Sequence, residues 1–592
     1  MSERGNRRRR IAAAAVMLTL VAVFGFRLFD IQVVRAPQLN EDSKDKRSVP
    51  VTVSSVRGDI VDRSGNVLAS TDQRYDVQLS PKNVKAFYRA APDGKGTVQV
   101  SPEQAFAEIA SVTGQTPEEI QEIVAEALKD NPKSDFAYVK RSVDLAALNE
   151  LKSLGIHWLT FDQNPSRVYP NGAVAGSLIG FVGNENQPQA GLELSQNTCL
   201  TGVDGVETYE RGADGVALPN STVVMQATQN GGTVNTTISR DLQWQLQQTV
   251  NRKTSEVGAE WGMAVVMDVK TGELVAVAED GSVDPNNVDG TEPNRREARS
   301  FTWPYEPGST FKTITAAALI DTGKATPETP QLTPDYIVMP DGARFGDAFQ
   351  HGELPFTLAG ILVQSSNVGI SLLGQQLSNE VRHDYLTKFG VGQPTESGMP
   401  YEDSGMLAAA ADWDVQTQYT TMFGQGLSST IVQTAGIFQT FANGGVRIPP
   451  TLVSGCTAED GTVTPHDGGD PVTVVTPETS ATMMHMMEAV VQESNLKEFV
   501  GIPGYRIAGK TGTAEQADGQ GGYRDTYVHS FAGIFPAEAP RYVAVVSIAH
   551  PQGGDGALAA LGGFREAAAA TIKEFRIPPS SGAYEPLKIM TE

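Results

Sequence analysis

The sequence of 592 residues has little of what disulfide-rich and metal-binding proteins need. It contains only two cysteines, Cys199 and Cys456, and seven histidines. The cysteines lie far apart in different predicted domains, so they imply no disulfide framework, although a single bridge between them stays open. The histidines are scattered, and neither a CxxC nor an HExxH motif occurs. We therefore expect neither metal catalysis nor a cofactor.

Positive charge is scarce outside the first residues. The net charge is −23, although residues 1–10 hold five arginines and a single glutamate, so the rest of the chain is more acidic than the total. An acidic surface repels a phosphate backbone, and we therefore expect no nucleic-acid partner. With 40% hydrophobic and 19% charged residues, the composition indicates a globular chain long enough for two or more domains.

Long hydrophobic runs are absent except near the start. Residues 11–26 carry no charge, and the three residues that follow extend the segment to 11–29, which is just long enough to cross a bilayer. The preceding arginines favour a cytoplasmic tail at 1–10 and an extracytoplasmic body, with Arg27 at the outer interface. The alternative is a cleaved signal peptide, but no small-residue cleavage site follows the run. We expect a single-pass membrane anchor.

The first module after this anchor is predicted at 30–232 and mixes strands with helices. Residues 49–56 alternate as a strand does, and Ser64-Gly65-Asn66 is typical of a hairpin turn. Two helices are predicted after the capping residues Ser101 and Thr116. A glycine-rich stretch at 202–220 leads out of this module.

The second module is predicted at 233–578, followed by a flexible tail at 579–592. Its expected strands are 236–239, 262–268, 273–278, 505–510, 529–535 and 542–549. Helices are expected between the early and the late strands, beginning with 241–250, and 564–575 is expected to close the module. Strands at both ends with helices between them indicate an α+β fold, in which one sheet packs on a helical layer.

Ser309 and Lys312 are the first candidates for chemistry. A serine and a lysine three residues apart on a helix share a face, so the amine can accept the hydroxyl proton. The same spacing also occurs at Ser43 with Lys46 and at Ser494 with Lys497. Only Ser309 follows Pro307-Gly308, which can start a helix, and precedes an apolar run that would bury the lysine and lower its pKa. The other two pairs lie in charged or polar segments, a juxtamembrane linker and a solvated helix end.

Two further short motifs fit a peptide-binding cleft. Ser365 and Asn367 supply a hydroxyl and an amide that can move a proton and hold a substrate amide. Lys510-Thr511-Gly512-Thr513, at the end of the strand predicted at 505–510, supplies a cation and hydroxyls for a carboxylate, and Gly512 permits close approach of a ligand. Two similar triplets are interpreted as turns: Ser195-Gln196-Asn197 and Lys270-Thr271-Gly272.

These motifs resemble those of the penicillin-binding proteins, specifically the monofunctional class B transpeptidases. The resemblance covers nearly the whole chain. It rests on residues 57–69, 167–170, 305–312, 365–369, 423–426 and 510–513. It implies an N-terminal transmembrane helix, an elongated α+β pedestal of the dimerisation type, and a transpeptidase domain with an antiparallel sheet sandwiched by helices beside an all-helical subdomain. The short tail and single span resemble the division branch, and the elongation branch is the alternative.

The resemblance also implies roles for the catalytic residues. Ser309 would attack the penultimate D-Ala carbonyl of a peptidoglycan stem peptide, and Lys312 would accept its proton. Ser365 would pass a proton to the leaving amine, with Lys510 as the fourth catalytic residue. The backbone N–H groups of Ser309 and Thr513 would form an oxyanion hole.

Substrate binding is implied for the remaining motif residues. Asn367 would bind the peptide amide, and Lys510, Thr511 and Thr513 would hold the terminal carboxylate beside Gly512. β-Lactams would acylate the same serine. Because no glycosyltransferase domain is present, the resemblance implies a membrane glycosyltransferase of the FtsW or RodA type and divisome proteins as partners. A D,D-carboxypeptidase, a β-lactamase and a non-catalytic β-lactam sensor are the alternative functions.

Overall fold

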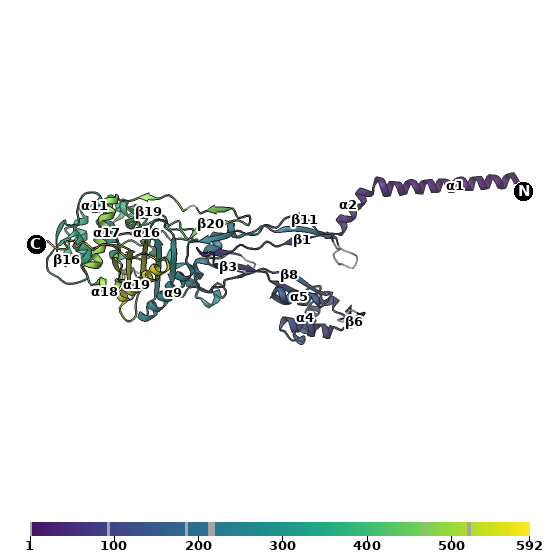
Figure 1. The fold of residues 1–592 in the computed structure, drawn as a ribbon, viewed down its shortest axis with the longest axis horizontal. Coiled ribbons are helices and arrows are strands. Elements are labelled where there is room, and N and C mark those ends of the chain that lie inside the picture. The colour runs from purple at the N-terminus through teal and green to yellow at the C-terminus, as the bar shows by residue number, and fades with distance from the viewer. Residues whose placement is uncertain are drawn as a thin grey trace. The chain divides into compact units, whose positions relative to one another are not determined.

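The computed structural model describes residues 3–91, 95–183, 187–210, 220–466, 468–517 and 522–591. The chain divides into two compact units, Met1–Val56 with Thr201–Gly231, and Arg57–Leu200 with Gly232–Glu592. Figure 1 labels their elements along the chain. The central part of the glycine-rich stretch predicted at 202–220, residues 211–219, lies outside the described residues.

The first unit contains the apolar N-terminal helix and a small sheet. Helix α1 (Glu3–Phe29) continues through a π-helical turn (Asp30–Val34) into α2 (Ala36–Arg47). The stretch Asn6–Val34 is long and apolar enough to cross a membrane, and none of its most apolar window is buried. The three-stranded antiparallel sheet has the order β1-β10-β11, with bounds Ser48–Val53, Gly205–Glu210 and Val223–Gln226. Strand β1 accounts for most of the strand predicted at 49–56.

The second unit begins with a small α+β module that has its own core. A three-stranded sheet of β7 (Ala137–Val143), β4 (Tyr75–Leu79) and β8 (Leu159–Gln163) packs with its helices. Those helices are α3 (Pro102–Thr113), α4 (Pro117–Asp130) and α5 (Leu145–Ser153), accompanied by the hairpin β5 (Phe87–Ala90) and β6 (Thr97–Val100). Ser101 and Thr116 cap α3 and α4 through side-chain hydrogen bonds, which confirms the predicted helix starts.

A six-stranded sheet joins segments that are distant in sequence. Its order is β21-β20-β12-β2-β3-β9, with bounds Val463–Pro465, Val453–Thr457, Thr233–Thr236, Ile60–Val61, Val67–Asp72 and Ser166–Val168. The predicted turn between β2 and β3 is confirmed, and Gly65 has the φ of +83° that favours glycine there. The strand predicted at 236–239 is wrong, because β12 ends at Thr236 and Ser239 instead caps the following helix.

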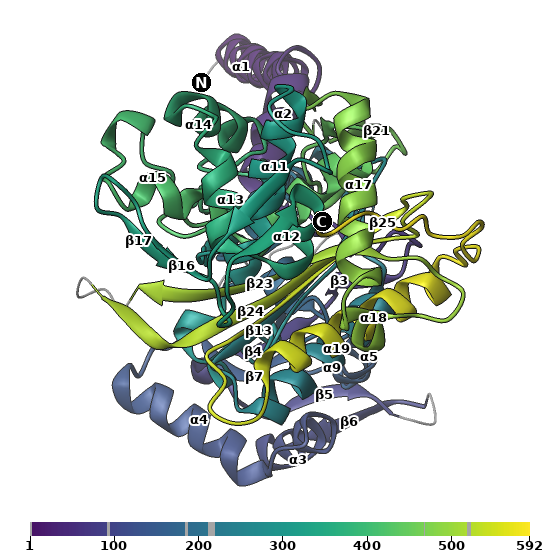
Figure 2. The same cartoon turned by 90° about the vertical axis from the view of Figure 1, so that its left-hand side faces the viewer.

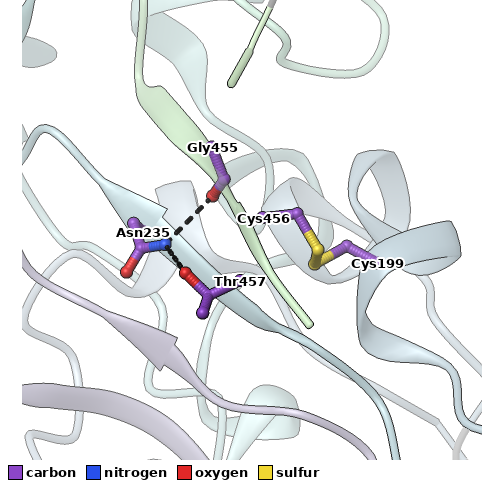
Figure 3. The surroundings of a disulfide bond; sticks show 5 residues. All are labelled: Cys199, Asn235, Gly455, Cys456 and Thr457. Atoms are coloured by element: carbon purple, nitrogen blue, oxygen red, sulfur yellow. Dashed lines mark hydrogen bonds between the residues drawn. A yellow bond between two sulfur atoms is a disulfide. The ribbon is translucent and has the colours of Figure 1, made fainter. Parts of the chain in front are cut away.

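A disulfide joins Cys199 to Cys456, the pairing that the sequence left open. Cys199 lies on α8 (Asn197–Leu200) and Cys456 on β20, and both belong to the second compact unit (Figure 3). Asn235 on the neighbouring β12 donates a hydrogen bond to the Thr457 hydroxyl at 2.8 Å. The sequence separation of 257 between the two cysteines explains why sequence spacing carried no signal for the bond.

A five-stranded antiparallel sheet forms the centre of the C-terminal part. Its order is β14-β13-β25-β24-β23, with bounds Leu274–Glu279, Trp261–Asp268, Tyr542–Ala549, Tyr523–Phe535 and Ala508–Ala517. Helices α9 (Arg240–Val257) and α19 (Gly556–Glu574) cover one face (Figure 2). Both faces are buried in hydrophobic cores, and β13 and β25 are accordingly almost continuously apolar. The strand predicted at 505–510 starts later and runs longer, because β23 pairs with β24 from Ala508 to Ala517.

The opposite face of this sheet carries a helical layer. It includes α11 (Lys312–Asp321), α12 (Leu358–Gln364), α13 (Asn367–Gly374), α14 (Asn379–Lys388), α16 (Ile431–Ala442) and α17 (Pro477–Gln492), whereas α18 (Leu496–Val500) packs against α19 on the other face. Two short helices, α10 (Arg299–Thr302) and α15 (Thr417–Thr420), also lie in this part of the chain. Two small hairpins that the sequence did not predict interrupt the layer: β15 (Pro330–Thr333) with β18 (Leu354–Thr357), and β16 (Tyr336–Val338) with β17 (Arg344–Gly346). The second of these leads directly to the candidate site.

The segment predicted as a flexible tail makes specific contacts instead. Ser580 N donates to Gly504 O at 2.8 Å, and Thr357 Oγ1 donates to Lys588 O at 2.6 Å. The backbone N–H of Thr357 also donates to the Ile589 carbonyl. These hydrogen bonds attach the tail to the helical layer, a tertiary interaction that local composition does not encode.

Candidate active site

Ser309 lies on the short 3₁₀ helix Gly308–Phe311 that leads directly into α11. Lys312 is the first residue of α11, and its Nζ lies 2.6 Å from Ser309 Oγ. Gly308 has a φ of +59°, and a Cβ there would lie 2.6 Å from the Thr513 carbonyl oxygen. Glycine therefore allows the serine segment to approach β23 closely, which brings the hydroxyl to the edge of the sheet.

The Lys312 amine is fully buried among polar oxygens. Besides Ser309 Oγ, its Nζ lies 2.6 Å from Asn367 Oδ1 and 3.4 Å from Ser365 Oγ. Burial holds the pKa of Lys312 well below its usual range, and the nearby charge of Lys510 lowers this pKa further. The apolar run after Lys312 was expected to have this effect, and the structure confirms it: 313–319 are all buried. A neutral amine beside a serine hydroxyl is an effective proton acceptor.

Ser365 and Asn367 come from the junction of two helices. Ser365 adopts a left-handed conformation with φ of +56° immediately after α12, and Asn367 is the first residue of α13. Ser366, between them, caps α13 by accepting a hydrogen bond from Gly369 N at 2.8 Å. Asn367 Nδ2 donates to Gly346 O at 2.9 Å, and this hydrogen bond fixes the orientation of the side-chain amide.

Lys510 connects strand β23 to the same group of residues. Its Nζ lies 2.9 Å from Ser365 Oγ and 3.1 Å from Thr511 Oγ1, and the side chain is fully buried. Burial lowers the pKa of Lys510 to about 7. The structure thus joins Ser309, Lys312, Ser365 and Lys510 through consecutive short contacts, as the motifs predicted.

The remaining residues of this motif lie farther along the strand. Thr513 is exposed, Thr511 is half-buried, and β23 is the last strand of its sheet, so its outer edge can pair with an extended peptide. One expectation is wrong here. The motif lies inside β23 and does not end the strand. The protein's own backbone also lies close to Gly512, since a Cβ at this position would lie 2.7 Å from Pro307 O.

The look-alike motifs are not part of this group. Ser43 and Lys46 lie on α2 in the first unit, with the lysine exposed. Ser494 follows α17, and its hydroxyl donates back to Val490 O, which agrees with a helix end. Lys270-Thr271-Gly272 forms the turn between β13 and β14, as predicted.

Three residues near the site were not identified from the sequence. Asp347 and His351, in the segment after β17, lie behind Asn367, and no motif marks them. Glu306 directly precedes Pro307 in the quoted serine motif, so its position offered a signal. Its carboxylate Oε1 lies 3.3 Å from the Gly426 backbone nitrogen, and burial raises the pKa of Glu306 to about 7.

Two family models match the chain. The penicillin-binding protein transpeptidase domain matches residues 262–569, and the penicillin-binding protein dimerisation domain matches residues 52–236. The first match includes the whole catalytic group described above.

Curated relatives match along almost the full length. Penicillin-binding protein PbpB of Mycolicibacterium smegmatis is 35% identical, over 98% of this chain and 92% of the relative. Peptidoglycan D,D-transpeptidase FtsI of Escherichia coli K12 is 31% identical, over 92% of this chain and 87% of the relative.

Solved structures agree with this assignment. Penicillin-binding protein 3 of Mycobacterium tuberculosis in complex with ampicillin is 28% identical, with a TM-score of 0.70 over 92% of this chain and 100% of that one. A peptidoglycan synthetase from Bifidobacterium adolescentis is also 28% identical, with a TM-score of 0.74 and the same coverage. With matched dimerisation and transpeptidase domains, and relatives of this similarity over nearly its whole length, the chain belongs to the class B penicillin-binding proteins.

Proposed function

We propose that this chain is a peptidoglycan D,D-transpeptidase that cross-links stem peptides through an acyl-enzyme on Ser309, acts in septal wall synthesis, and is a target of β-lactams. The observation that carries the proposal is the buried Lys312 amine, 2.6 Å from Ser309 Oγ and without an ion-pair partner among the described residues. Relatives named PbpB and FtsI, and a relative's structure in complex with ampicillin, support it.

Acylation begins at the Ser309–Lys312 contact. Ser309 Oγ attacks the carbonyl carbon of the penultimate D-Ala, while its proton moves to the neutral Nζ of Lys312. The negative charge that develops on the carbonyl oxygen is stabilised by the backbone N–H groups of Ser309 and Thr513, which their adjacent segments bring to one side of the cleft. Loss of one such donor costs about 3 to 4 kcal/mol in a comparable site.

Collapse of this intermediate releases the terminal D-Ala. The C–N bond breaks, and the leaving nitrogen takes a proton through the Ser365 hydroxyl, which lies between Lys312 and Lys510. The products are a Ser309 ester and free D-alanine. An amine of a neighbouring stem peptide then attacks the ester carbonyl and gives a proton to Lys312; the bond from the carbonyl carbon to Ser309 Oγ breaks, and Lys312 returns the proton to Oγ, which regenerates the serine.

Substrate binding uses the outer edge of β23. The donor peptide lies beside this strand, with its terminal carboxylate near Lys510, Thr511 and Thr513. Asn367 binds the peptide amide through its side chain, whose orientation Gly346 O fixes.

Membrane attachment and partners complete the proposal. Residues 11–29 span the membrane once, the arginines of residues 1–10 remain in the cytoplasm, and the catalytic domain lies outside. A pedestal at 30–232 and a transpeptidase domain at 233–578 follow, and a membrane glycosyltransferase of the FtsW or RodA type supplies the glycan strands. Co-purification of the two proteins and a changed polymerisation rate test this partnership; failure of both would contradict it.

The catalytic assignment is tested by labelling with a fluorescent penicillin. We expect Ser309→Ala to abolish labelling, whereas Ser494→Ala, which alters a serine with the same spacing to a lysine, leaves it unchanged. Slow release of the label supports a transpeptidase, and rapid hydrolysis would indicate a β-lactamase. Analysis of the products formed from stem peptides separates cross-linking from carboxypeptidase activity. Labelling that persists in Ser309→Ala would overturn the assignment.

A further inference from the structure

A buried acid and histidine lie behind the catalytic group without a role in the reaction described above. Asp347 follows β17 directly, and His351 lies four residues later. Their side chains are only 1% and 6% exposed, and Asp347 Oδ2 lies 3.1 Å from His351 Nε2. Burying two ionisable groups is costly unless they are paired, so the arrangement needs an explanation.

The hydrogen bonds of the ring indicate its protonation state. His351 Nε2 faces the Asp347 carboxylate, and His351 Nδ1 faces Gly352 O at 2.6 Å. Both partners are acceptors, and a neutral imidazole can donate from only one nitrogen. An imidazolium donates to both, so Asp347 and His351 form an ion pair.

The same acid connects to the catalytic residues through helix α13. Asp347 Oδ1 accepts a hydrogen bond from Val368 N at 2.9 Å, and the preceding Gly346 O accepts one from Asn367 Nδ2. Asn367 in turn places its Oδ1 at 2.6 Å from Lys312 Nζ. The segment 346–347 therefore fixes the start of α13 and the side chain that touches the amine.

Asp347 also acts on the catalytic group through its negative charge. Lys312 and Lys510 are both fully buried, and neither forms an ion pair with a carboxylate in the part of the chain that the structure describes. Asp347 is the acid whose charge acts on Lys312, raising its pKa against the opposing effects of burial and Lys510. The positive charge that Lys312 acquires when Ser309 attacks is thus attracted towards Asp347.

We propose that Asp347 is a positioning residue for Asn367 and Lys312, and that His351 controls how much of the Asp347 charge acts on the Lys312 amine. With an imidazolium beside it, Asp347 is partly neutralised and Lys312 stays a neutral base. When His351 loses its proton, the unscreened carboxylate favours the ammonium form of Lys312. This inference rests on the proposed acylation of Ser309 and concerns its dependence on pH.

The groups that face the pair are few. Asp335 accepts a hydrogen bond from His351 N and adds negative charge near the ring, while Lys312 is the amine on which the charge of Asp347 acts. Burial lowers the pKa of His351, but the hydrogen bond to Gly352 O and the charges of Asp347 and Asp335 outweigh it, so this pKa is raised. The ring therefore keeps its proton to a higher pH than an ordinary imidazole does.

The test is the rate constant for acylation of the full chain by benzylpenicillin, measured between about pH 4.5 and about pH 9. Asp347→Asn keeps an acceptor for Val368 N but removes the charge. His351→Asn keeps a donor to Asp347 but removes the imidazolium. Asp341→Asn, in the same hairpin but bonded to Tyr419 OH and Gln418, is the matched control.

We expect the two variants to move the ascending limb of the pH profile in opposite directions, by about one pH unit each. Asp347→Asn lowers the pKa of Lys312, so the ascending limb of this variant's pH profile moves to lower pH or falls below the measured range. His351→Asn raises this pKa, so its limb moves to higher pH, while Asp341→Asn matches the wild type.

A purely structural role predicts a lower rate in both variants with an unmoved limb, and shifts in the same direction would also overturn the proposal. If Asp347→Asn fails to fold, His351→Asn and His351→Gln decide the matter, since both must move the limb to higher pH. If the wild-type chain is not acylated at Ser309 at all, the proposed function itself is wrong. That result is distinguishable from acylation with unshifted profiles.

Discussion

The second unit contains two groups of buried basic side chains, and the two groups differ in how their positive charge is compensated. In the structural cluster, Arg57, Arg167 and Glu193 are buried together, and the carboxylate lies 2.7 Å from a nitrogen of each arginine. In the catalytic cluster, Lys312 and Lys510 are buried against hydroxyl and amide oxygens. In the first cluster one carboxylate contacts both positive charges, whereas no carboxylate of the described residues contacts either lysine of the second.

The difference shows how burial produces either stability or reactivity. A guanidinium keeps its proton in most surroundings, so burying it is costly unless an acid or other hydrogen-bond acceptors compensate the charge. A lysine can lose its proton, and burial without an acid in contact lowers its pKa until it does. The structural cluster therefore stays charged, whereas the catalytic cluster provides a neutral amine. Four sets of substitutions test whether the two clusters differ in this way.

The largest effect is expected from Lys312→Arg. Arginine keeps a positive charge at this position but cannot accept the proton of Ser309, so acylation by penicillin should fall about 10³- to 10⁴-fold, or about 4 to 5 kcal/mol. Stopped-flow labelling measures the rate. Lys497→Arg, in the similar Ser494 motif, should label normally. A variant that is still acylated rapidly would show that a cation at this position is sufficient.

Glu193→Gln should give the next largest effect, and on stability. It leaves two buried guanidinium groups without the carboxylate between them, which should cost about 3 to 5 kcal/mol of unfolding free energy in urea. Glu150→Gln, at an exposed site on α5, should change stability by less than about 0.5 kcal/mol. Equal stability of the two variants would mean that the cluster does not depend on its central acid.

Loss of the disulfide should lower the stability of the region around the structural cluster and leave the reactivity of the catalytic cluster unchanged. Asn197, two residues before Cys199, accepts a hydrogen bond from Arg57 at 2.7 Å. Replacing both cysteines by serine should lower the unfolding free energy by about 2 to 5 kcal/mol while penicillin labelling of the folded protein persists. Treatment with a reductant should destabilise the wild type alone. Loss of labelling under folded conditions would contradict the separation of the two clusters.

Glu306→Gln should give the smallest effect, visible as a pH dependence. Burial raises the pKa of the Glu306 carboxyl to about 7, and the charge of Glu515 adds to this rise. Its stabilising contribution is complete below the unfolded pKa of 4.5 and is lost as the pH rises through about 7. The unfolding free energy of the wild type should thus fall by about 3 kcal/mol over this range relative to the variant. Parallel curves for both proteins would show that Glu306 is already ionised.

The sequence predicted the local parts of the site well. The Ser309–Lys312 contact follows from helical spacing, and the burial of the amine follows from the apolar residues after it. The caps at Ser101 and Thr116 were found for the same reason, because a cap and its helix lie within a few residues. Strand bounds were less well predicted, since β23 owes its length to pairing with β24.

Contacts between distant segments lay outside the reach of sequence spacing. Ser365 and Lys510 are 145 residues apart, and their meeting was expected only from the resemblance of their motifs to a known family. Asp347 and His351 carry no motif, and their importance follows from the hairpin that places them behind α13. The attachment of the C-terminal tail to Thr357 was likewise not predicted.

The sequence alone was enough to identify three features of this protein: an apolar N-terminal helix, a serine with a lysine one helical turn away, and a second lysine on a strand. These properties depend on residue type and short spacing. Which of the basic side chains have a carboxylate in contact depends on the tertiary structure. It placed Glu193 between two arginines and put Asp347 behind Asn367, and in the part of the chain that the structure describes no acid contacts Lys312 or Lys510. Protonation depends on what surrounds a group in space, and folding alone supplies those neighbours.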